Sequence, residues 1–172
     1  MLLASISVGI ICGLFITWVK LNLGMPGHKG FFWMAPVLIA RLRTGCKTGT
    51  TAGGLSAALT TYCLGANLAG GLIGLPLIVL AAAVLDVAVN YIEKNKSSFL
   101  ITLSVLCLAG IAANIICLAK RMILPTGINA SYIFGVSGFW FKILSYGFFG
   151  FLSGFTAAIS TRIKKQNDPN AS

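Results

Sequence analysis

The sequence predicts an all-α membrane protein, a bundle of six transmembrane helices, and three observations support this fold class. Hydrophobic residues make up 57% of the 172 residues, only 9% are charged, and the mean hydropathy is +0.92. A soluble domain of ordinary composition has about 25% charged residues, so this chain has too few to cover a surface exposed to water. The apolar residues also fall into runs of the length that crosses a bilayer, with basic residues between them.

Five apolar runs reach the length of a spanning helix, which needs about 20 mainly apolar residues. They cover residues 2–19, 50–66, 68–89, 98–119 and 131–160. The first lacks the basic start and the cleavage site of a signal peptide, so we expect it to be retained as a helix. The last is longer than the bilayer requires, and we expect it to tilt or to begin with an interfacial turn.

A sixth segment, residues 31–40, is open to two interpretations. Its apolar run is short, Pro36 lies inside it, and Arg41 and Arg43 come after it. If both arginines extend to the lipid headgroups, the segment spans the bilayer and the bundle has six spans. If it does not span, it is re-entrant and the bundle has five spans.

The basic residues predict the orientation of the bundle. Thirteen Lys and Arg residues against three acidic residues give a net charge of +10. Basic loops of membrane proteins stay on the cytoplasmic side, so the positive charge does not require a nucleic-acid partner. The same rule places the C-terminus in the cytoplasm with six spans and with five. The N-terminus is cytoplasmic with six spans and external with five, and charge alone slightly favours five. We expect one bundle in the cell membrane, residues 1–163, with a polar cytoplasmic tail, residues 164–172.

The sequence contains no motif of a catalytic, nucleotide-binding or metal site. The patterns G-x-S-x-G, H-E-x-x-H, the P-loop and the dinucleotide-binding glycines are all absent. His28 is the single histidine, and the five cysteines do not have the spacing of a zinc site. We therefore expect a protein that is not an enzyme and that has no metal or cofactor. If it transports a substrate, another subunit supplies the energy.

Small residues recur at helical spacing, most clearly Ser5, Gly9 and Gly13 in the first apolar run. In lipid, such a face lets two helix backbones approach closely. Two interpretations remain open for this face, namely packing inside the bundle and docking onto a partner protein.

Two further polar residues, Asp86 and Asn90, lie one helical turn apart toward the cytoplasmic end of their apolar run. Polar groups inside a membrane segment usually have a specific partner. We expect this pair to contact another protein or to form an ion pair with a basic loop.

Polar and aromatic residues also gather near the segment ends that the six-span arrangement places outside. They are Trp33, Asn67, Asn114, Asn129, Tyr132, Trp140 and Lys142. Polar side chains are costly in hydrocarbon and tend to face cavities, so this set is the candidate substrate-binding site. The alternatives are an interfacial aromatic belt, helix caps at Asn67 and Asn129, and a Lys142 side chain that extends to the headgroups.

The first external loop has the glycine-rich sequence LNLGMPGHKG, in which Gly27, His28 and Lys29 are candidate gating residues. The basic residues on the external side have no acidic counterpart there. They are Lys29, Lys120, Arg121 and Lys142. An anionic or neutral small molecule therefore fits this side better than a cation does.

Two stretches of the chain resemble the substrate-capture (S) component of energy-coupling factor (ECF) vitamin transporters. One stretch is residues 36–65, PVLIARLRTGCKTGTTAGGLSAALTTYCLG, which is similar to the short second helix, basic inner turn and glycine-rich third helix of those proteins. The other is residues 140–165, WFKILSYGFFGFLSGFTAAISTRIKK, which is similar to their glycine-rich final helix and basic tail. Length, six spans and cytoplasmic termini agree as well, so the resemblance covers most of the chain.

The resemblance implies a six-helix bundle that binds a vitamin-like micronutrient near its external face, with the first loop as a gate. It also implies a transmembrane scaffold protein and two ATPase subunits as partners, with Ser5, Gly9 and Gly13 as docking residues. In that family the docking motif is often a pair of alanines, which these three positions lack. The nickel and cobalt members begin with Met-His, whereas this chain begins Met-Leu-Leu, so those metals are disfavoured as substrates.

A different class of function is a small structural or assembly subunit of a larger membrane complex, without a ligand of its own. In that case helix packing accounts for every polar residue named above. A small molecule that co-purifies with the protein distinguishes the two classes.

Overall fold

The structure is a computed structural model that describes residues 1–19, 25–66, 68, 74–95, 98–123 and 138–167, with only the backbone for residues 120–123 and 164–167. In these ranges the chain forms six α-helices and no strand. They are α1 (Leu2–Trp18), α2 (His28–Thr44), α3 (Gly49–Cys63), α4 (Leu75–Asn95), α5 (Phe99–Ile123) and α6 (Gly138–Asn167). The all-α class predicted from the sequence is confirmed.

Three helices of the described part are long and apolar enough to cross a bilayer, namely α4, α5 and α6. A fourth helix, α1, is also apolar but has 17 residues, which corresponds to a length of about 26 Å. A hydrocarbon core is about 30 Å thick, so several helices of this kind in one chain indicate a multi-pass membrane protein.

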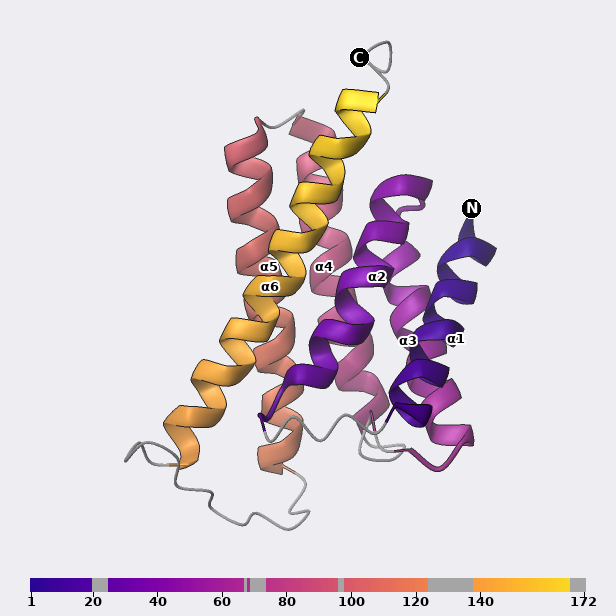
Figure 1. Cartoon of the computed structure of the whole chain (residues 1–172), viewed down its shortest axis with the longest axis vertical. Helices are drawn as coiled ribbons and strands as arrows, with labels where there is room; N and C mark the ends of the chain where they lie inside the picture. Colours follow the sequence, from indigo (N-terminus) through magenta and orange to yellow (C-terminus); the bar gives the residue numbers. More distant parts are fainter. Residues whose placement is uncertain (20–24, 67, 69–73, 96–97, 124–137, 168–172) are drawn as a thin grey trace.

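The helices form two neighbouring groups, with α1, α2 and α3 on one side and α4, α5 and α6 on the other (Figure 1). Helix α2 joins the groups because it contacts all five other helices. Helix α1 begins and helix α6 ends at the same end of the bundle (Figure 1), which we call the terminus end. We call the opposite end, where α1 ends and where α2 and α6 begin, the His28 end.

The segment with two interpretations, residues 31–40, is the middle of the continuous helix α2, which contains Pro36. Helix α2 runs from the His28 end toward the terminus end (Figure 1). Gly27 and Gly45 flank the helix with φ angles of 88° and 67°, a left-handed conformation that glycine adopts without a steric penalty.

Glycines let two pairs of helices pack backbone against backbone. A Cβ atom on Gly9 of α1 would lie 2.1 Å from the carbonyl oxygen of Gly53 in α3. Between α5 and α6, a Cβ on Gly110 would lie 2.2 Å from the carbonyl oxygen of Gly150. These distances leave no room for any side chain, so the glycines set the close approach of the helices.

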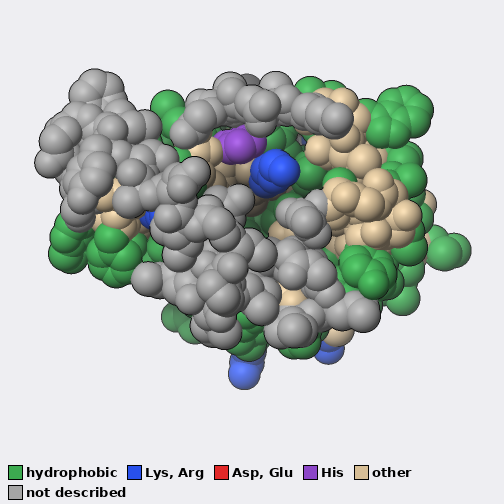
Figure 2. Space-filling model, turned by 90° about the horizontal axis from the view of Figure 1, so that it is seen from below, with side chains coloured by type: hydrophobic (Ala, Val, Ile, Leu, Met, Phe, Trp, Pro, Cys, Tyr) green, Lys and Arg blue, Asp and Glu red, His purple; other side chains and the backbone are tan. Residues whose placement is uncertain are grey.

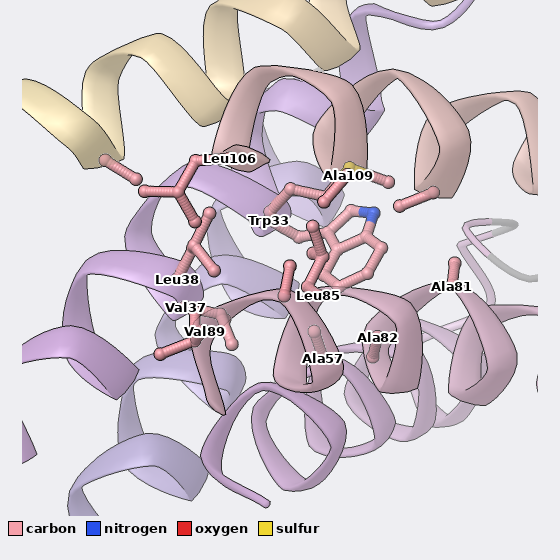
Figure 3. Close-up of a cluster of buried hydrophobic side chains, with 14 of the residues drawn as sticks. Trp33, Val37, Leu38, Ala57, Ala81, Ala82, Leu85, Val89, Leu106 and Ala109 are labelled. Atoms are coloured by element: carbon pink, nitrogen blue, oxygen red, sulfur yellow. The ribbon is translucent and has the colours of Figure 1, made fainter. Parts of the chain in front are cut away.

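The hydrophobic core lies where α2 meets α3, α4 and α5, and Trp33 of α2 is its largest side chain (Figure 3). The Trp33 ring packs toward α3, where a Cβ on Gly54 would lie 2.9 Å from it. Leu85 and Ala82 come from α4 and Ala109 from α5 (Figure 3). The missing side chain at Gly54 thus provides the space that the indole ring occupies.

Large apolar side chains cover the outward faces of the helices. Strongly exposed examples are Leu3, Trp18, Val87, Leu100, Leu108 and Leu144. In water a surface of this kind would be an aggregation hazard, whereas lipid tails solvate it.

Candidate functional site

The candidate site lies at the His28 end, where the residues before α2 are fixed to α6. The Ser145 hydroxyl of α6 donates a hydrogen bond to the Pro26 carbonyl oxygen. The neighbouring Tyr146 ring packs on Gly27, where a Cβ atom would lie 2.9 Å from the ring. Two successive residues of α6 therefore hold the segment that leads into α2.

His28 is the first residue of α2 and is tied to the same segment. Its Nδ1 atom donates a hydrogen bond to the Met25 carbonyl oxygen, since a carbonyl can only accept. Its Nε2 atom is buried and has no hydrogen-bond partner among the described residues. The ring also meets the edge of Phe149, with 6.3 Å between centroids. One nitrogen thus fixes the ring, and the other is left for a further polar group.

Asn114 of α5 connects three helices beneath this segment. Its side chain is completely buried, and its Nδ2 atom donates a 2.7 Å hydrogen bond to the Tyr146 carbonyl oxygen in α6. Its Oδ1 atom has no hydrogen-bond partner among the described residues and lies against Gly30 of α2, where a Cβ would be 2.2 Å away. Because burying an amide oxygen without a donor is costly, the Oδ1 atom of Asn114 is an unsatisfied polar group where α5 packs against α2.

The electrostatic character of the His28 end is basic. Lys29 is exposed and Lys142 is partly buried. The acids of the described residues, Asp86 and Glu93, both pair with Arg41 near the terminus end. In the view onto the His28 end, a histidine and a basic side chain lie next to each other, and the described residues show no acidic side chain on this face (Figure 2).

The space beside His28 is small in this structure. A cavity of about 10 Å³ lies among residues of α1 and the start of α2, including Phe15, His28 and Lys29. This volume corresponds to about one water molecule. A ligand larger than water therefore needs an opening between the 25–27 segment and the helices around it.

The structure places the predicted site residues in different environments. Trp33 is 1% exposed inside the core, and Trp140 is 59% exposed on the outward face of α6. Asn114 and Lys142 belong to the His28 end, whereas Asn67, Asn129 and Tyr132 lie outside the described residues. Trp33 therefore has a packing role in this structure and does not line the cavity beside His28.

The predicted gating residues lie at the start of α2 rather than in a loop. Gly27 is the N-cap residue of α2, and His28 and Lys29 form its first turn. The sequence had suggested a loop that extends to Gly30. This was wrong for residues 28–30, because glycine and proline are frequent both in loops and at helix starts. The part that precedes the helix and is held by α6 is the 25–27 segment.

The predicted docking residues pack against α3 inside the bundle. Ser5, Gly9 and Gly13 are all buried. A Cβ on Gly13 would lie 2.8 Å from Thr60, and the Ser5 hydroxyl lies 2.9 Å from the Cβ position of Gly49. In this structure α3 occupies the small-residue face of α1, so the face is not open to another protein.

A second polar group, which we call the Arg41 cluster, lies near the terminus end and consists of Arg41, Asp86, Asn90 and Glu93. Arg41 has no exposed surface, although its sequence position suggested a side chain that extends to the headgroups. It donates two 2.9 Å hydrogen bonds to Glu93 and one of 2.6 Å to the side-chain oxygen of Asn90. Its Nε atom lies 3.6 Å from Asp86 Oδ1.

Asp86 also caps helix α3 from outside. Its two carboxylate oxygens accept the backbone N–H groups of Thr50 and Thr51 at 2.9 and 2.8 Å, and the Thr51 hydroxyl at 2.6 Å. The first N–H groups of a helix lack partners within it and carry partial positive charge. The Arg41 cluster thereby joins α2, α3 and α4. The spacing of Asp86, Asn90 and Glu93 on one face of α4 is the sequence signal that identifies it.

The described residues contain no group of three side chains that could hold a metal ion, and the cysteines among them form no disulfide bond. Comparison of the chain with protein-family models, curated proteins and solved structures finds no match.

Proposed function

We propose that the protein is the membrane-embedded substrate-binding subunit of an ECF-type uptake transporter for a small, vitamin-like molecule. The resemblance of residues 36–65 and 140–165 to S components supports this function. In the proposed arrangement six helices span the cell membrane, both termini are cytoplasmic, and the His28 end faces outward.

The observation that carries the proposal is the uneven distribution of charge between the two ends. Both described acids are bound to Arg41 near the terminus end. At the His28 end, Lys29 and Lys142 have no acidic partner among the described residues, and buried polar atoms of His28 and Asn114 lack hydrogen bonds. An anionic or neutral polar molecule would supply the missing partners.

In this proposal the 25–27 segment acts as the gate. It is held by one hydrogen bond from Ser145 and by packing on Tyr146. A net hydrogen bond contributes about 1 kcal/mol, which is small enough for thermal opening. Opening at this position would enlarge the space beside His28 and admit a ligand.

The proposed partners come from the resemblance to S components, and the sequence has no nucleotide-binding motif of its own. Import against a gradient requires energy, so a transmembrane scaffold protein and two ATPase subunits are proposed as the other components. Because α3 covers Ser5, Gly9 and Gly13, the proposal does not assign the scaffold to that face.

Mass spectrometry of small molecules released from the purified protein tests this function directly. We expect one anionic or neutral compound at near-stoichiometric amount, and an increase in thermal stability when that compound is added back. The second candidate function, a structural or assembly subunit, is supported instead if repeated preparations hold no compound and a vitamin panel produces no thermal shift.

The topology is tested separately with single-cysteine variants at Lys29 and Lys47, which lie near opposite ends of α2. In a background without native cysteines, a membrane-impermeant maleimide should label Lys29→Cys from outside intact cells. Lys47→Cys should react only after the membrane is opened. Labelling of both positions from one side would contradict a spanning α2.

A further inference from the structure

The surface of the bundle carries an apolar groove of about 480 Å³ along the outward face of α2. Its floor consists of small or compact residues of α2, namely Ala35, Pro36 and Ala40. Val8 of α1 and Thr156 of α6 form the two walls. Since α1 and α6 both contact α2 and flank it, the groove follows the helix axis.

The two ends of the groove differ chemically. At the His28 end it is closed by Phe31 and Phe32, whose rings meet edge to face with 5.5 Å between centroids. At the other end lies Arg43, an exposed residue in the last turn of α2. The groove therefore has an apolar body and a single cationic end.

Arg43 is the polar group of the lining that remains available to a ligand. The Thr156 hydroxyl already donates a 2.8 Å hydrogen bond to the Leu152 carbonyl oxygen of its own helix. Arg43 has no ion pair among the described residues, because both described acids bind Arg41 two positions earlier. An occupant must therefore be apolar along its length and negatively charged at one end.

The length of the groove decides between a lipid chain and a protein helix. From Phe31 to Arg43 it follows about 18 Å of helix axis at about 1.5 Å per residue. This is close to one leaflet, about 15 Å, which is half of a hydrocarbon core of about 30 Å. An acyl chain occupies one leaflet, whereas a spanning partner helix needs the full thickness.

We propose that this groove binds one acyl chain of an anionic phospholipid from the leaflet at the terminus end, with the lipid phosphate on Arg43. Guanidinium groups bind phosphate through two parallel hydrogen bonds. Basic sites between membrane helices on the cytoplasmic side recognise anionic headgroups in the same way. Further exposed cations at this end, Lys47, Lys94 and Arg162, favour anionic lipid nearby.

Native mass spectrometry of the full chain in detergent tests the site, with dioleoyl phosphatidylglycerol and dioleoyl phosphatidylcholine added in separate titrations. One lysine or arginine near an anionic surface contributes enough for about a fivefold change in affinity. We therefore expect the wild type to bind phosphatidylglycerol about fivefold more tightly, and Arg43→Gln to bind both lipids equally.

Two variants separate the groove from general charge attraction. Arg162→Gln is the matched control, because Arg162 is also exposed at the terminus end but lies over the Phe99 ring, outside the groove. It should keep the preference for phosphatidylglycerol. Ala40→Phe fills the groove and should weaken binding of both lipids.

The proposal is overturned if Arg43→Gln keeps the preference, or if Arg162→Gln removes it to the same extent. It is also overturned if the wild type binds phosphatidylglycerol and phosphatidylcholine equally. That result would favour an apolar protein helix as the occupant of the groove. Because Arg43 is exposed, its substitution leaves the core intact and decides the question even if Ala40→Phe fails to fold.

Discussion

Near the terminus end of the bundle, Arg41 meets both acids of the described residues, whereas Lys29 and Lys142 at the His28 end meet none. The Arg41 cluster contains one guanidinium and two carboxylates, and the remaining negative charge faces the N-terminus of α3. Its charge is therefore compensated within the fold. At the His28 end, the cations have no acidic partner among the described residues.

This difference indicates what each end does. A buried charge with all its partners inside the chain stabilises one arrangement of helices, and removing one partner is strongly destabilising. A charge without an internal partner adds little to stability but attracts a ligand of opposite charge. We therefore expect substitutions near the terminus end to change stability, and substitutions at the His28 end to change binding.

The largest effect is expected for Arg41→Met. It leaves the buried carboxylate of Asp86 without its guanidinium partner, and breaking such a pair costs about 3 kcal/mol, the low end of the usual range because the side chain of the other partner, Glu93, is 43% exposed. Denaturant titration of the purified protein in detergent measures the free energy of unfolding. Arg43→Met is the matched control, because this exposed arginine on the same helix should change the value by less than about 0.5 kcal/mol. Similar losses in both variants would contradict the structural role of the Arg41 cluster.

A smaller effect, on binding, is expected for Lys142→Met. A lysine in hydrocarbon without a partner costs at least about 2.5 kcal/mol, and a ligand carboxylate would relieve part of this cost. A charge-assisted hydrogen bond contributes about 1.5–3 kcal/mol, so the Kd of the co-purifying ligand should rise about ten- to a hundredfold.

Isothermal titration of ligand-free protein measures the Kd of the Lys142→Met variant. Lys47→Met, which removes a lysine at the opposite end, should leave it unchanged. If Lys142→Met binds as tightly as the wild type, Lys142 only extends to the headgroups, and the comparison of the two ends loses its functional meaning.

The smallest effect is expected for Ser145→Ala, which removes the hydrogen bond to the Pro26 carbonyl oxygen. A loss of about 1 kcal/mol should raise the open fraction of the 25–27 segment about fivefold. The deuterium-labelling rate of the Gly30 amide, which donates a hydrogen bond to the Gly27 carbonyl oxygen, reports this opening. Ser153→Ala is the control, because the Ser153 hydroxyl bonds only to the Phe149 carbonyl within its own helix. Equal labelling rates in the two variants would argue against Ser145 as the latch of the gate.

The sequence predicted the all-α class and the approximate positions of the helices, since apolar runs are a local property. It did not predict where α2 and α4 end. Helix α2 continues through Arg41, and α4 continues to Asn95, because Arg41 pairs with Asn90 and Glu93 at the end of α4. These contacts join residues that are 49 and 52 positions apart in the sequence. The hydropathy of a single segment carries no information about contacts with a segment so far away.

The candidate site was predicted only in part, for a related reason. Periodicity identified the face of Ser5, Gly9 and Gly13 but not its occupant, which is α3. The position of Trp33 near the start of an apolar run suggested a ring in the substrate-binding site or, alternatively, at the membrane interface, yet Gly54 of α3 opens space for it in the core. Asn114 was identified because an amide inside an apolar helix requires a partner, and its partner is a backbone carbonyl of α6.

The pairing of Arg41 has a consequence for the biosynthesis of the chain. A ribosome completes α2 before it makes the partners of Arg41, the first of which is Asp86 and the last of which is Glu93, 52 residues after Arg41. During that interval the translocon holds a helix with a proline and an unpaired guanidinium, and such a helix partitions poorly into lipid by itself. Helix α2 is therefore expected to enter the bilayer late, together with α4. If α2 spans the bilayer as proposed, truncated chains that stop before residue 86 should then leave α2 outside the hydrocarbon.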